Sequence, residues 1–245
     1  ISSDSWTISD GGAVVVDTGF TFSILTTNAG SASDTFVLPL INNGVIDIDV
    51  DWGDSSTDNI TAYNDPEVTH IYSATGTYTI NMSGTIRGWR FLNGGDKLKI
   101  LNISNWGDMN ITDTYTFWGC TNLTSDATDA PTISTTTFRY MFLNCVNFNG
   151  AMDGWDVSGV TNLQSMFGSC SAFNQPIGNW DTSNVTKLEN MFSNATSFDQ
   201  DISAWDIESV TNFNGFMSGA TLSTANYDAL LIGWDAQSVS SGESP

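Results

Sequence analysis

The C-terminal half of the chain is built from a repeat of 25 residues, and this period constrains the fold more than any other feature. Trp155, Trp180 and Trp205 stand 25 residues apart. The same offset aligns three further columns of apolar residues: Val160, Val185 and Val210; Leu163, Leu188 and Phe213; and Met166, Met191 and Phe216. A last column extends upstream as Phe117, Phe142, Phe167, Phe192 and Met217, which makes about five units visible. Because each unit exposes an apolar edge that only a neighbour covers, the period predicts a solenoid with repeated surface positions.

The three cysteines fall in one column of this repeat. Cys120, Cys145 and Cys170 are followed in the same register by Ala195 and Ala220. A position shared by Cys and Ala is typical of a small buried slot, in which free Cys behaves as a small hydrophobe. A disulfide between adjacent units is the alternative, although an odd number of cysteines leaves one unpaired. No CxxC or Cys/His spacing indicates zinc.

Each unit predicts a short strand followed by a helical turn. The β-branched pair Val-Thr favours a strand, and Leu163, Met166 and Phe167 follow the i, i+3, i+4 spacing of a helical turn. Asn149, with its equivalents at positions 174 and 199, is expected to form a side-chain ladder that satisfies backbone groups of the turns. We therefore expect a mainly β fold with short helical turns.

The units end at a predicted capping helix. Trp234 follows Trp205 by 29 residues, which breaks the register. Ser223 or Thr224 can N-cap a helix with four apolar residues on one face: Tyr227, Leu230, Leu231 and Trp234. A membrane-active helix is disfavoured because its polar face carries no basic residue.

Residues 20–92 show a different pattern, in which apolar and polar residues alternate as in Val45 to Trp52. Period-two strands separated by Asn-, Gly- and Asp-rich turns predict a small antiparallel β-sandwich. We expect residues 1–19 to form a strand or linker, residues 93–235 to hold the repeats with their caps, and residues 236–245 to form a tail.

The segment "DVDWGDSSTDN", followed by "EVTHIYSATGTYTINMSG", resembles the PKD family of immunoglobulin-like modules. The matching residues are Trp52, Gly53, Asp54, His70, Tyr72, Gly76, Thr77, Tyr78 and Ile80. Ser55 stands where the family usually has a glycine. We expect Gly53 and Asp54 to form a tight turn and Gly76 to take a positive φ. The resemblance implies a spacer or interaction module without catalytic residues.

The segments "FNGAMDGWDVSGVTNLQSMFGSC", "FNQPIGNWDTSNVTKLENMFSNA" and "FDQDISAWDIESVTNFNGFMSGA" resemble the BspA-like bacterial surface-protein repeat of the leucine-rich type, found in mycoplasma lipoproteins. The resemblance covers residues 98–235. It implies a leucine-rich-repeat-like solenoid, surface display and binding to proteins or host cells, and it implies no enzymatic activity.

Charge narrows the choice of partners. The chain has 27 acidic and 6 basic residues, so it lacks the Lys and Arg clusters that nucleic acids and anionic membrane surfaces require. Such acidity is typical of a secreted protein that stays soluble by self-repulsion. No run of about 20 apolar residues is present, so we expect no membrane span.

Few residues are candidates for catalysis or metal binding. Asp156, Asp181 and Asp206 occupy one column and should share one structural role, whereas a catalytic carboxylate pair needs two different environments. We therefore expect no enzymatic activity and no cofactor. Calcium is the exception to weigh, because four aspartates crowd one segment: Asp47, Asp49, Asp51 and Asp54. They would otherwise form a solvated sheet surface.

These observations favour an extracellular or cell-surface adhesion protein that recognises a protein or glycan on a cell or matrix through the side face of the solenoid. The candidate contacts vary between units beside constant positions: Asn162, Lys187 and Asn212 in one column, and Gln164, Glu189 and Asn214 in another. The alternative is a self-assembling structural or decoration subunit of a filament, matrix or phage virion.

Overall fold

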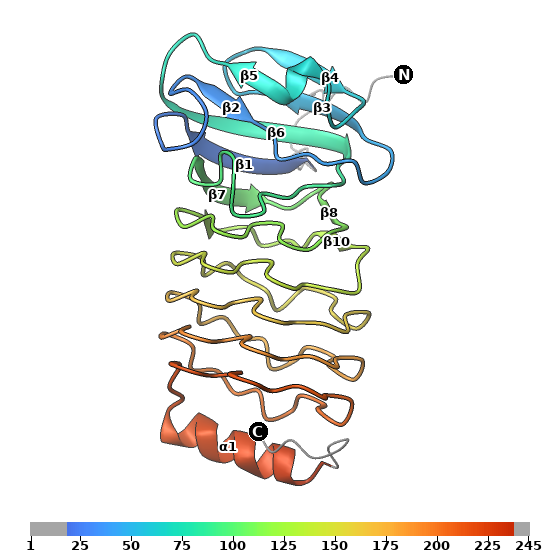
Figure 1. Cartoon of the computed structure of the whole chain (residues 1–245), viewed down its shortest axis with the longest axis vertical. Coiled ribbons are helices and arrows are strands. Elements are labelled where there is room, and N and C mark those ends of the chain that lie inside the picture. Colours follow the sequence, from blue (N-terminus) through green and yellow to red (C-terminus); the bar gives the residue numbers. More distant parts are fainter. Residues whose placement is uncertain (1–18, 238–245) are drawn as a thin grey trace, which may run out of the picture.

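The computed structural model describes residues 19–237, and these are mainly β with one α-helix at the C-terminal end (Figure 1). The strands are β1 (Phe20–Leu25), β2 (Thr35–Val37), β3 (Asp47–Asp51), β4 (Thr57–Ile60), β5 (Thr69–Ile71), β6 (Thr77–Thr85), β7 (Ile100–Asn105), β8 (Asn110–Ile111), β9 (Thr124–Ser125) and β10 (Thr132–Ile133). The 3-10 turn η1 (Pro66–Val68) precedes β5, and the helix is α1 (Thr224–Asp235). One mixed sheet has the order β4-β3-β6-β1-β7-β9, and two small sheets pair β2 with β5 and β8 with β10.

Alternation of apolar and polar residues places the core on one face of the main sheet. In β1, Phe20, Phe22 and Ile24 have no solvent exposure. In β3, Ile48 and Val50 are buried, while the aspartates that alternate with them are exposed. Successive side chains of a strand point to opposite faces, so each apolar set falls on the core side.

Strand β1 joins the sheet to the repeats. It pairs antiparallel with β6 on one side and with β7 on the other, and β7 pairs in parallel with β9. The main sheet therefore continues past residue 92. The separate β2–β5 pair packs onto this sheet, with the Phe36 and Phe22 ring centroids 6.0 Å apart. We call residues 19–105 the N-terminal layer and residues 106–237 the repeat stack.

Units of the repeat stack lie one below another (Figure 1), joined by backbone hydrogen bonds between residues about one period apart. Phe142 N–H donates to Met166 O at 3.0 Å, and Phe167 N–H donates to Met191 O at 3.0 Å. Single-residue parallel bridges connect Thr137, Asn162, Lys187 and Asn212 in that order. The 25-residue period is thus the spacing of directly stacked residues.

Stacked aromatic rings fill the interior of the repeat stack. Centroids are 5.5, 5.9 and 5.8 Å apart along the ladder Phe117, Phe142, Phe167 and Phe192. They are 6.3 and 6.0 Å apart along a second ladder, Phe148, Phe173 and Phe198. Large buried rings dominate core energetics, and every unit contributes to these ladders.

The prediction of a helical turn over residues 163–167 is wrong. The segment forms tight turns, in which Met166 N–H donates to Leu163 O and Cys170 N–H to Phe167 O. Ser165, with φ of 53°, interrupts any helix. Positive φ recurs at two positions of every unit: residues 115, 140, 165, 190 and 215, and residues 119, 144, 169, 194 and 219. The expected Val-Thr strand is likewise absent, and a one-residue bridge forms at the residue after each pair, as at Asn162.

The cysteines lie in the small buried slot that the sequence predicts. Cys120, Cys145 and Cys170 are free and have no solvent exposure. The thiol of Cys145 donates to Phe117 O at 3.0 Å, which ties one unit to the preceding one. Burial raises the pKa of the Cys120 and Cys170 thiols well above the usual value.

The predicted side-chain ladder is also present and continues into the cap. Asn149 Oδ1 accepts from Asn174 N–H at 2.8 Å, and Asn174 Oδ1 accepts from Asp199 N–H at 2.9 Å. Asp199 Oδ1 then accepts from Ser223 N–H at 2.8 Å. Ser223 is the N-cap of α1, so the ladder positions the helix that closes the stack.

Helix α1 covers the last unit with part of its apolar face. Leu230 and Trp234 are buried, as the prediction requires, but Tyr227 and Leu231 remain 53% and 44% exposed. The indole N–H of each tryptophan at the successive positions 180, 205 and 234 donates to a carbonyl of the preceding unit: Met152, Ile177 and Ile202. Although Trp234 is out of register in the sequence, the helix places its indole where the next tryptophan of the column would lie, with the same type of hydrogen bond to the preceding unit.

Candidate functional site

The six candidate contact residues lie together on one side of the repeat stack. Asn162, Lys187 and Asn212 are directly stacked by the parallel bridges. Lys187 is exposed, while the two asparagines are half-buried because each carboxamide also stabilises its own turn. Asn162 Oδ1 accepts from Gln164 N–H, and Asn212 Oδ1 accepts from Asn214 N–H, both at 2.9 Å.

The second column is joined through side chains. Gln164 Nε2 donates to Glu189 Oε2 at 3.0 Å, and Asn212 Nδ2 donates to the same oxygen at 3.1 Å. Asn214 at the end of the column is exposed. The two predicted columns therefore form one continuous polar surface. It combines the Glu189 carboxylate, the Lys187 ammonium and the side-chain amides of the other four residues.

The upper end of this surface was not predicted from the sequence. Arg139 precedes Gln164 in the same column, and its guanidinium carbon lies 4.6 Å from the ring centroid of Tyr140. Tyr115 and Trp118 of the unit above lie beside Tyr140. The signal was present in the period: aromatic residues occupy positions 115 and 140, where the later units have Ser165, Asn190 and Gly215.

The four aspartates considered for calcium bind protein donors instead of converging. Asn59 Nδ2 donates to Asp49 Oδ1 at 2.9 Å and to Asp47 Oδ1 at 3.3 Å, whereas Asp51 Oδ1 accepts from Gly53 N–H. In the part of the chain that the structure describes, no three His, Cys, Asp or Glu side chains gather in a way that could hold a metal ion. Calcium at this segment stays a prediction.

Asp54 belongs to an aromatic cluster that includes the only histidine of the chain. His70 Nε2 lies 2.9 Å from Asp54 Oδ2, and its ring stacks on Trp52 with centroids 4.6 Å apart. Burial alone would raise the pKa of Asp54, but hydrogen bonds from Ser56 and His70 lower it from 3.8 to about 2. The Tyr72 hydroxyl donates to Trp52 O at 3.2 Å. These contacts give His70 a packing role in the cluster.

The turn in this cluster follows the sequence prediction at one glycine only. Gly53 has a φ of 79°, and a Cβ there would lie 2.2 Å from Thr79 O. Gly76 does not take the expected positive φ. It exchanges hydrogen bonds with Thr26 instead, donating to the hydroxyl oxygen and accepting from the backbone N–H, both at 3.0 Å.

The aspartate column beside the tryptophans has one environment. Asp156 Oδ1 accepts from Ser158 N–H at 3.0 Å, Asp181 Oδ1 from Ser183 N–H at 3.1 Å, and Asp206 Oδ1 from Glu208 N–H at 3.0 Å. Hydrogen bonds from the serines lower the pKa of Asp156 and Asp181. This geometry caps turns and does not separate an acid from a base.

A sequence model described as "Mycoplasma protein of unknown function, DUF285" matches residues 81–181 and residues 111–230. The two matches together cover more than half of the chain. The chain belongs to the DUF285 family. No PKD module is identified in residues 20–92 by the same comparison, so that resemblance stays a prediction. No curated protein and no solved structure matches the chain. Within residues 19–237 the single α-helix, α1, falls short of the length and hydropathy that crossing a bilayer requires.

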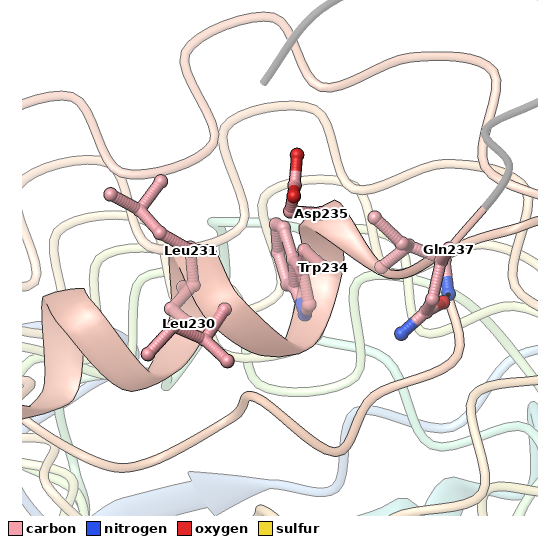
Figure 2. A pocket seen from close by; sticks show the side chains of 7 residues that line it. Leu230, Leu231, Trp234, Asp235 and Gln237 are labelled. Carbon is pink, nitrogen blue, oxygen red and sulfur yellow. Dashed lines mark hydrogen bonds between the residues drawn. The ribbon is translucent and has the colours of Figure 1, made fainter.

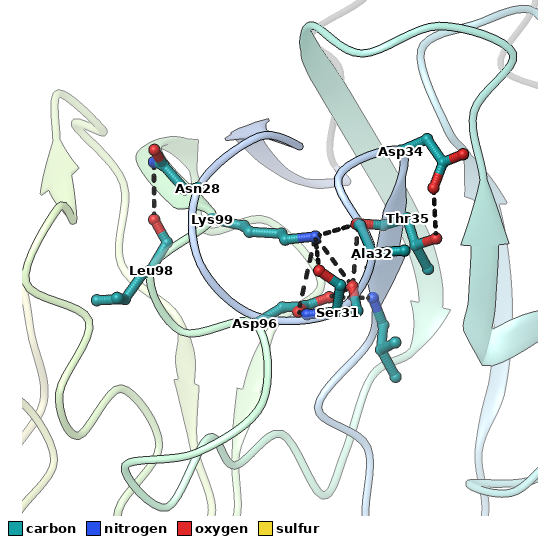
Figure 3. A network of polar contacts seen from close by, with 9 residues as sticks. Asn28, Ser31, Ala32, Asp34, Thr35, Asp96, Leu98 and Lys99 are labelled. Atoms are coloured by element: carbon teal, nitrogen blue, oxygen red, sulfur yellow. Dashed lines mark hydrogen bonds and ion pairs between the residues drawn. The ribbon is translucent and has the colours of Figure 1, made fainter.

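One buried polar network joins residues 31–37 to Asp96 and Lys99, of which only the last two lie inside the DUF285 match (Figure 3). The Lys99 side chain has no solvent exposure, and its Nζ donates to Ala32 O at 2.8 Å and to Thr35 O at 2.6 Å. Asp96 Oδ2 accepts from Val37 N–H at 2.7 Å. Burial lowers the pKa of Lys99, and the charges of Asp96 and Asp34 oppose this shift. The network fixes the β1–β2 loop against the junction with the repeats.

An apolar surface lies at the opposite end of the DUF285 units, around α1 (Figure 2). Leu230 and Trp234 line a shallow pocket of about 510 Å³ together with the more exposed Leu231. Ile232 beside them is 75% exposed. Helix α1 thus covers the aromatic core at the end of the stack, and its outer side exposes apolar side chains to solvent.

Proposed function

We propose that this chain is a non-catalytic extracellular or cell-surface binding protein. In this proposal the DUF285 units form a leucine-rich-repeat-like solenoid of the BspA-like type, whose side face recognises a protein or glycan on a cell or matrix surface. Residues 20–92 act as a PKD-like spacer that holds the solenoid away from its point of attachment.

One observation carries the proposal: positions stacked in one column of parallel bridges present different side chains. Asn162, Lys187 and Asn212 share one bridge column, yet they offer an amide, an ammonium and an amide. Glu189 adds a carboxylate beside them, fixed by two amide donors. A rigid scaffold with variable polar positions lowers the entropy cost of binding, because the side chains are already positioned.

The test compares this surface with another face of the same units. The labelled full chain is titrated on candidate host cells and on an array of glycans and matrix proteins, together with the variants Lys187→Gln and Gln164→Ala. Asp153→Asn is the matched control, because Asp153 is exposed and occupies a different column. We expect saturable binding that both surface variants weaken about tenfold and the control leaves unchanged. Saturable binding that neither surface variant alters would exclude this face.

Helix α1 favours the alternative of a structural or decoration subunit that assembles end to end with a second copy. Tyr227, Leu231 and Ile232 are exposed there, and apolar end surfaces drive association. Sedimentation velocity over a range of concentrations tests this, with Ile232→Ser as the variant. Association abolished by this substitution would favour the structural role in a filament, matrix or virion, whereas a monomer at all concentrations would remove it.

A further inference from the structure

Three half-buried aromatic rings form a platform at the top of the repeat stack. The ring centroids of Tyr115, Trp118 and Tyr140 are 5.3 to 5.9 Å apart, and their planes are inclined to one another by only 34° to 37°. We call these three residues the aromatic platform. The three rings are tilted to one another and in mutual contact, so together they form one contiguous, half-buried aromatic surface.

The fold does not require aromatic residues at these positions. The column of Tyr115 and Tyr140 continues as Ser165, Asn190 and Gly215, and the column of Trp118 continues as Leu143, Gly168, Ser193 and Ser218. Tyr115 and Tyr140 also have φ of 63° and 59°. Every unit has a positive φ at this position, so the turn imposes the left-handed backbone, and it does so without requiring an aromatic side chain.

Two donors next to the platform lack a partner. Within residues 19–237, neither Trp118 Nε1 nor Arg139 Nε has a hydrogen-bond partner, although both atoms are buried. The indole Nε1 atoms of Trp89, Trp106 and Trp155 are in the same state, so these two donors support a ligand site only through their place beside the platform. Arg139 is held in place by its Nη2, which donates to the Tyr140 hydroxyl at 3.2 Å.

Positive charge gathers at the platform in a chain that has only six basic residues. Arg139 lies over the face of Tyr140. Lys97 Nζ lies 3.0 Å from the point that a Cβ on Gly119 would occupy, so its ammonium is beside the backbone that follows Trp118. Arg90 pairs with Asp113 at 3.5 Å, in the turn that leads to Tyr115. Arg139 thus contacts the platform directly, Lys97 lies beside the backbone next to it, and the charge of Arg90 is paired with Asp113.

We propose that this surface binds an acidic saccharide chain, with pyranose rings stacked on the aromatic platform and their carboxylate or sulfate groups paired with Arg139 and Lys97. The C–H bonds of a pyranose ring face are attracted to the negative face of an aromatic ring. A guanidinium pairs bidentately with planar anionic groups. The negative charge of the remaining chain repels polyanions at long range, so binding depends on these local contacts and weakens with salt.

This inference rests on the proposed binding function, because Arg139 belongs to the same column as Gln164 and Glu189. It differs in ligand class and in residues, so the two can fail separately. An acidic peptide could satisfy the cations, but a polyglutamate chain offers no sugar ring faces to the three aromatic rings.

The experiment uses the full chain and variants that copy residues from neighbouring units. Trp118→Leu and Tyr140→Ser place at each position the residue found one period later, at Leu143 and Ser165, so the fold is expected to tolerate them. Affinity for hyaluronan and chondroitin sulfate is measured by titration, with dextran as the neutral polymer and poly-L-glutamate as the acidic peptide. Thermal unfolding of each variant verifies folding, and Trp118→Phe tests whether an aromatic ring restores binding.

We expect saturable binding to at least one acidic polysaccharide. Trp118→Leu and Arg139→Gln should each weaken it about tenfold or more, Trp118→Phe should largely retain it, and Lys187→Gln should leave it unchanged. Binding to neither acidic polysaccharide, or equal binding to poly-L-glutamate, would overturn the inference. Cell or matrix-protein binding that survives Trp118→Leu but is lost in Lys187→Gln would leave the proposed function standing without this site.

Discussion

The N-terminal layer and the repeat stack distribute their side-chain polar contacts in opposite ways. In the layer, one ammonium, Lys99, holds the β1–β2 loop through several carbonyls, and one carboxylate, Asp96, closes the network. In the stack, a contact such as the one from Asn174 to Asp199 is repeated in the next unit. Side-chain polar contacts in the layer are unique, whereas those in the stack are shared among equivalents.

This difference indicates where each region tolerates change. A unique buried network has no substitute if one member is lost, and a partly satisfied network is worse than an apolar one. In a stack, stability is approximately a sum over units and their interfaces, so the loss of one polar contact leaves the neighbouring contacts intact. Surface variation is therefore easier to accommodate in the stack, which is where the candidate binding residues lie.

Lys99→Met should give the largest effect on stability. The substitution retains much of the side-chain volume but leaves Asp96 buried without its cation, and breaking a buried pair in this way costs about 3–5 kcal/mol. Urea unfolding of the variant measures the change. Lys187→Met, at an exposed position, is the control and should change the free energy of unfolding by less than about 0.5 kcal/mol. Equal effects of the two substitutions would contradict the contrast between the regions.

Asp54→Asn should destabilise the N-terminal layer by about 2 kcal/mol at pH 7, because hydrogen bonds to a charged acceptor are lost. The folded-state pKa of Asp54 is about 2 and its ordinary value is 3.8, so the folded state binds fewer protons between these values. The stabilisation is thus present above pH 4 and is lost as the pH falls towards 2. Melting temperatures of wild type and variant across this range should converge at low pH. A difference that stays constant with pH would show that the carboxylate charge is unimportant.

The period predicted most of the stack, and it could do so because direct stacking places residues of one column in one environment. The ladder of Asn149 and Asn174 and the buried Cys slot follow from that equivalence, whereas the N-cap at Ser223 or Thr224 was predicted from the break in the register and is found at Ser223. The predicted helical turn at 163–167 was wrong because the i, i+3, i+4 spacing of apolar residues also suits tight turns. The positive φ at Ser165 ends any helix there, and a serine gives no sign of that φ in the sequence.

Contacts that occur once in the layer could not be predicted in this way, because no equivalent position repeats them. "KLKI" contains two lysines with the same alternation, and only tertiary contacts place Lys99 in the interior while Lys97 stays half-exposed beside Gly119. The aromatic platform was not predicted because its residues differ from those at the equivalent positions of later units. A repeat period predicts the structural role of constant positions and predicts nothing about positions that vary.

Asn174→Ala should cost about 1 kcal/mol, less than either change in the layer. Its Oδ1 accepts from Asp199 N–H, and removing that acceptor interrupts the ladder at one rung. The bond from Ser223 N–H to Asp199 is retained, so α1 should remain docked. Hydrogen exchange measured by mass spectrometry should show faster exchange around residue 199 and unchanged protection of α1. Loss of protection throughout the helix would mean that the ladder acts as one cooperative unit and that its contacts are not separable.

Cys145→Ala should have the smallest effect, under about 1 kcal/mol, because the same column already contains Ala195 in a fully buried position. The change removes one sulfur atom and its donation to Phe117 O, and the Cys170 donation to Phe142 O in the next unit is retained. Urea unfolding checks the size of the loss. The equivalent contact that remains is the reason for expecting a small value, so the double variant Cys145→Ala/Cys170→Ala gives the sharper test. If the two losses simply add, each interface stabilises the stack independently; a loss well beyond the sum would show that neighbouring units compensate for one another, and the stack would then be more cooperative than its repeated contacts imply.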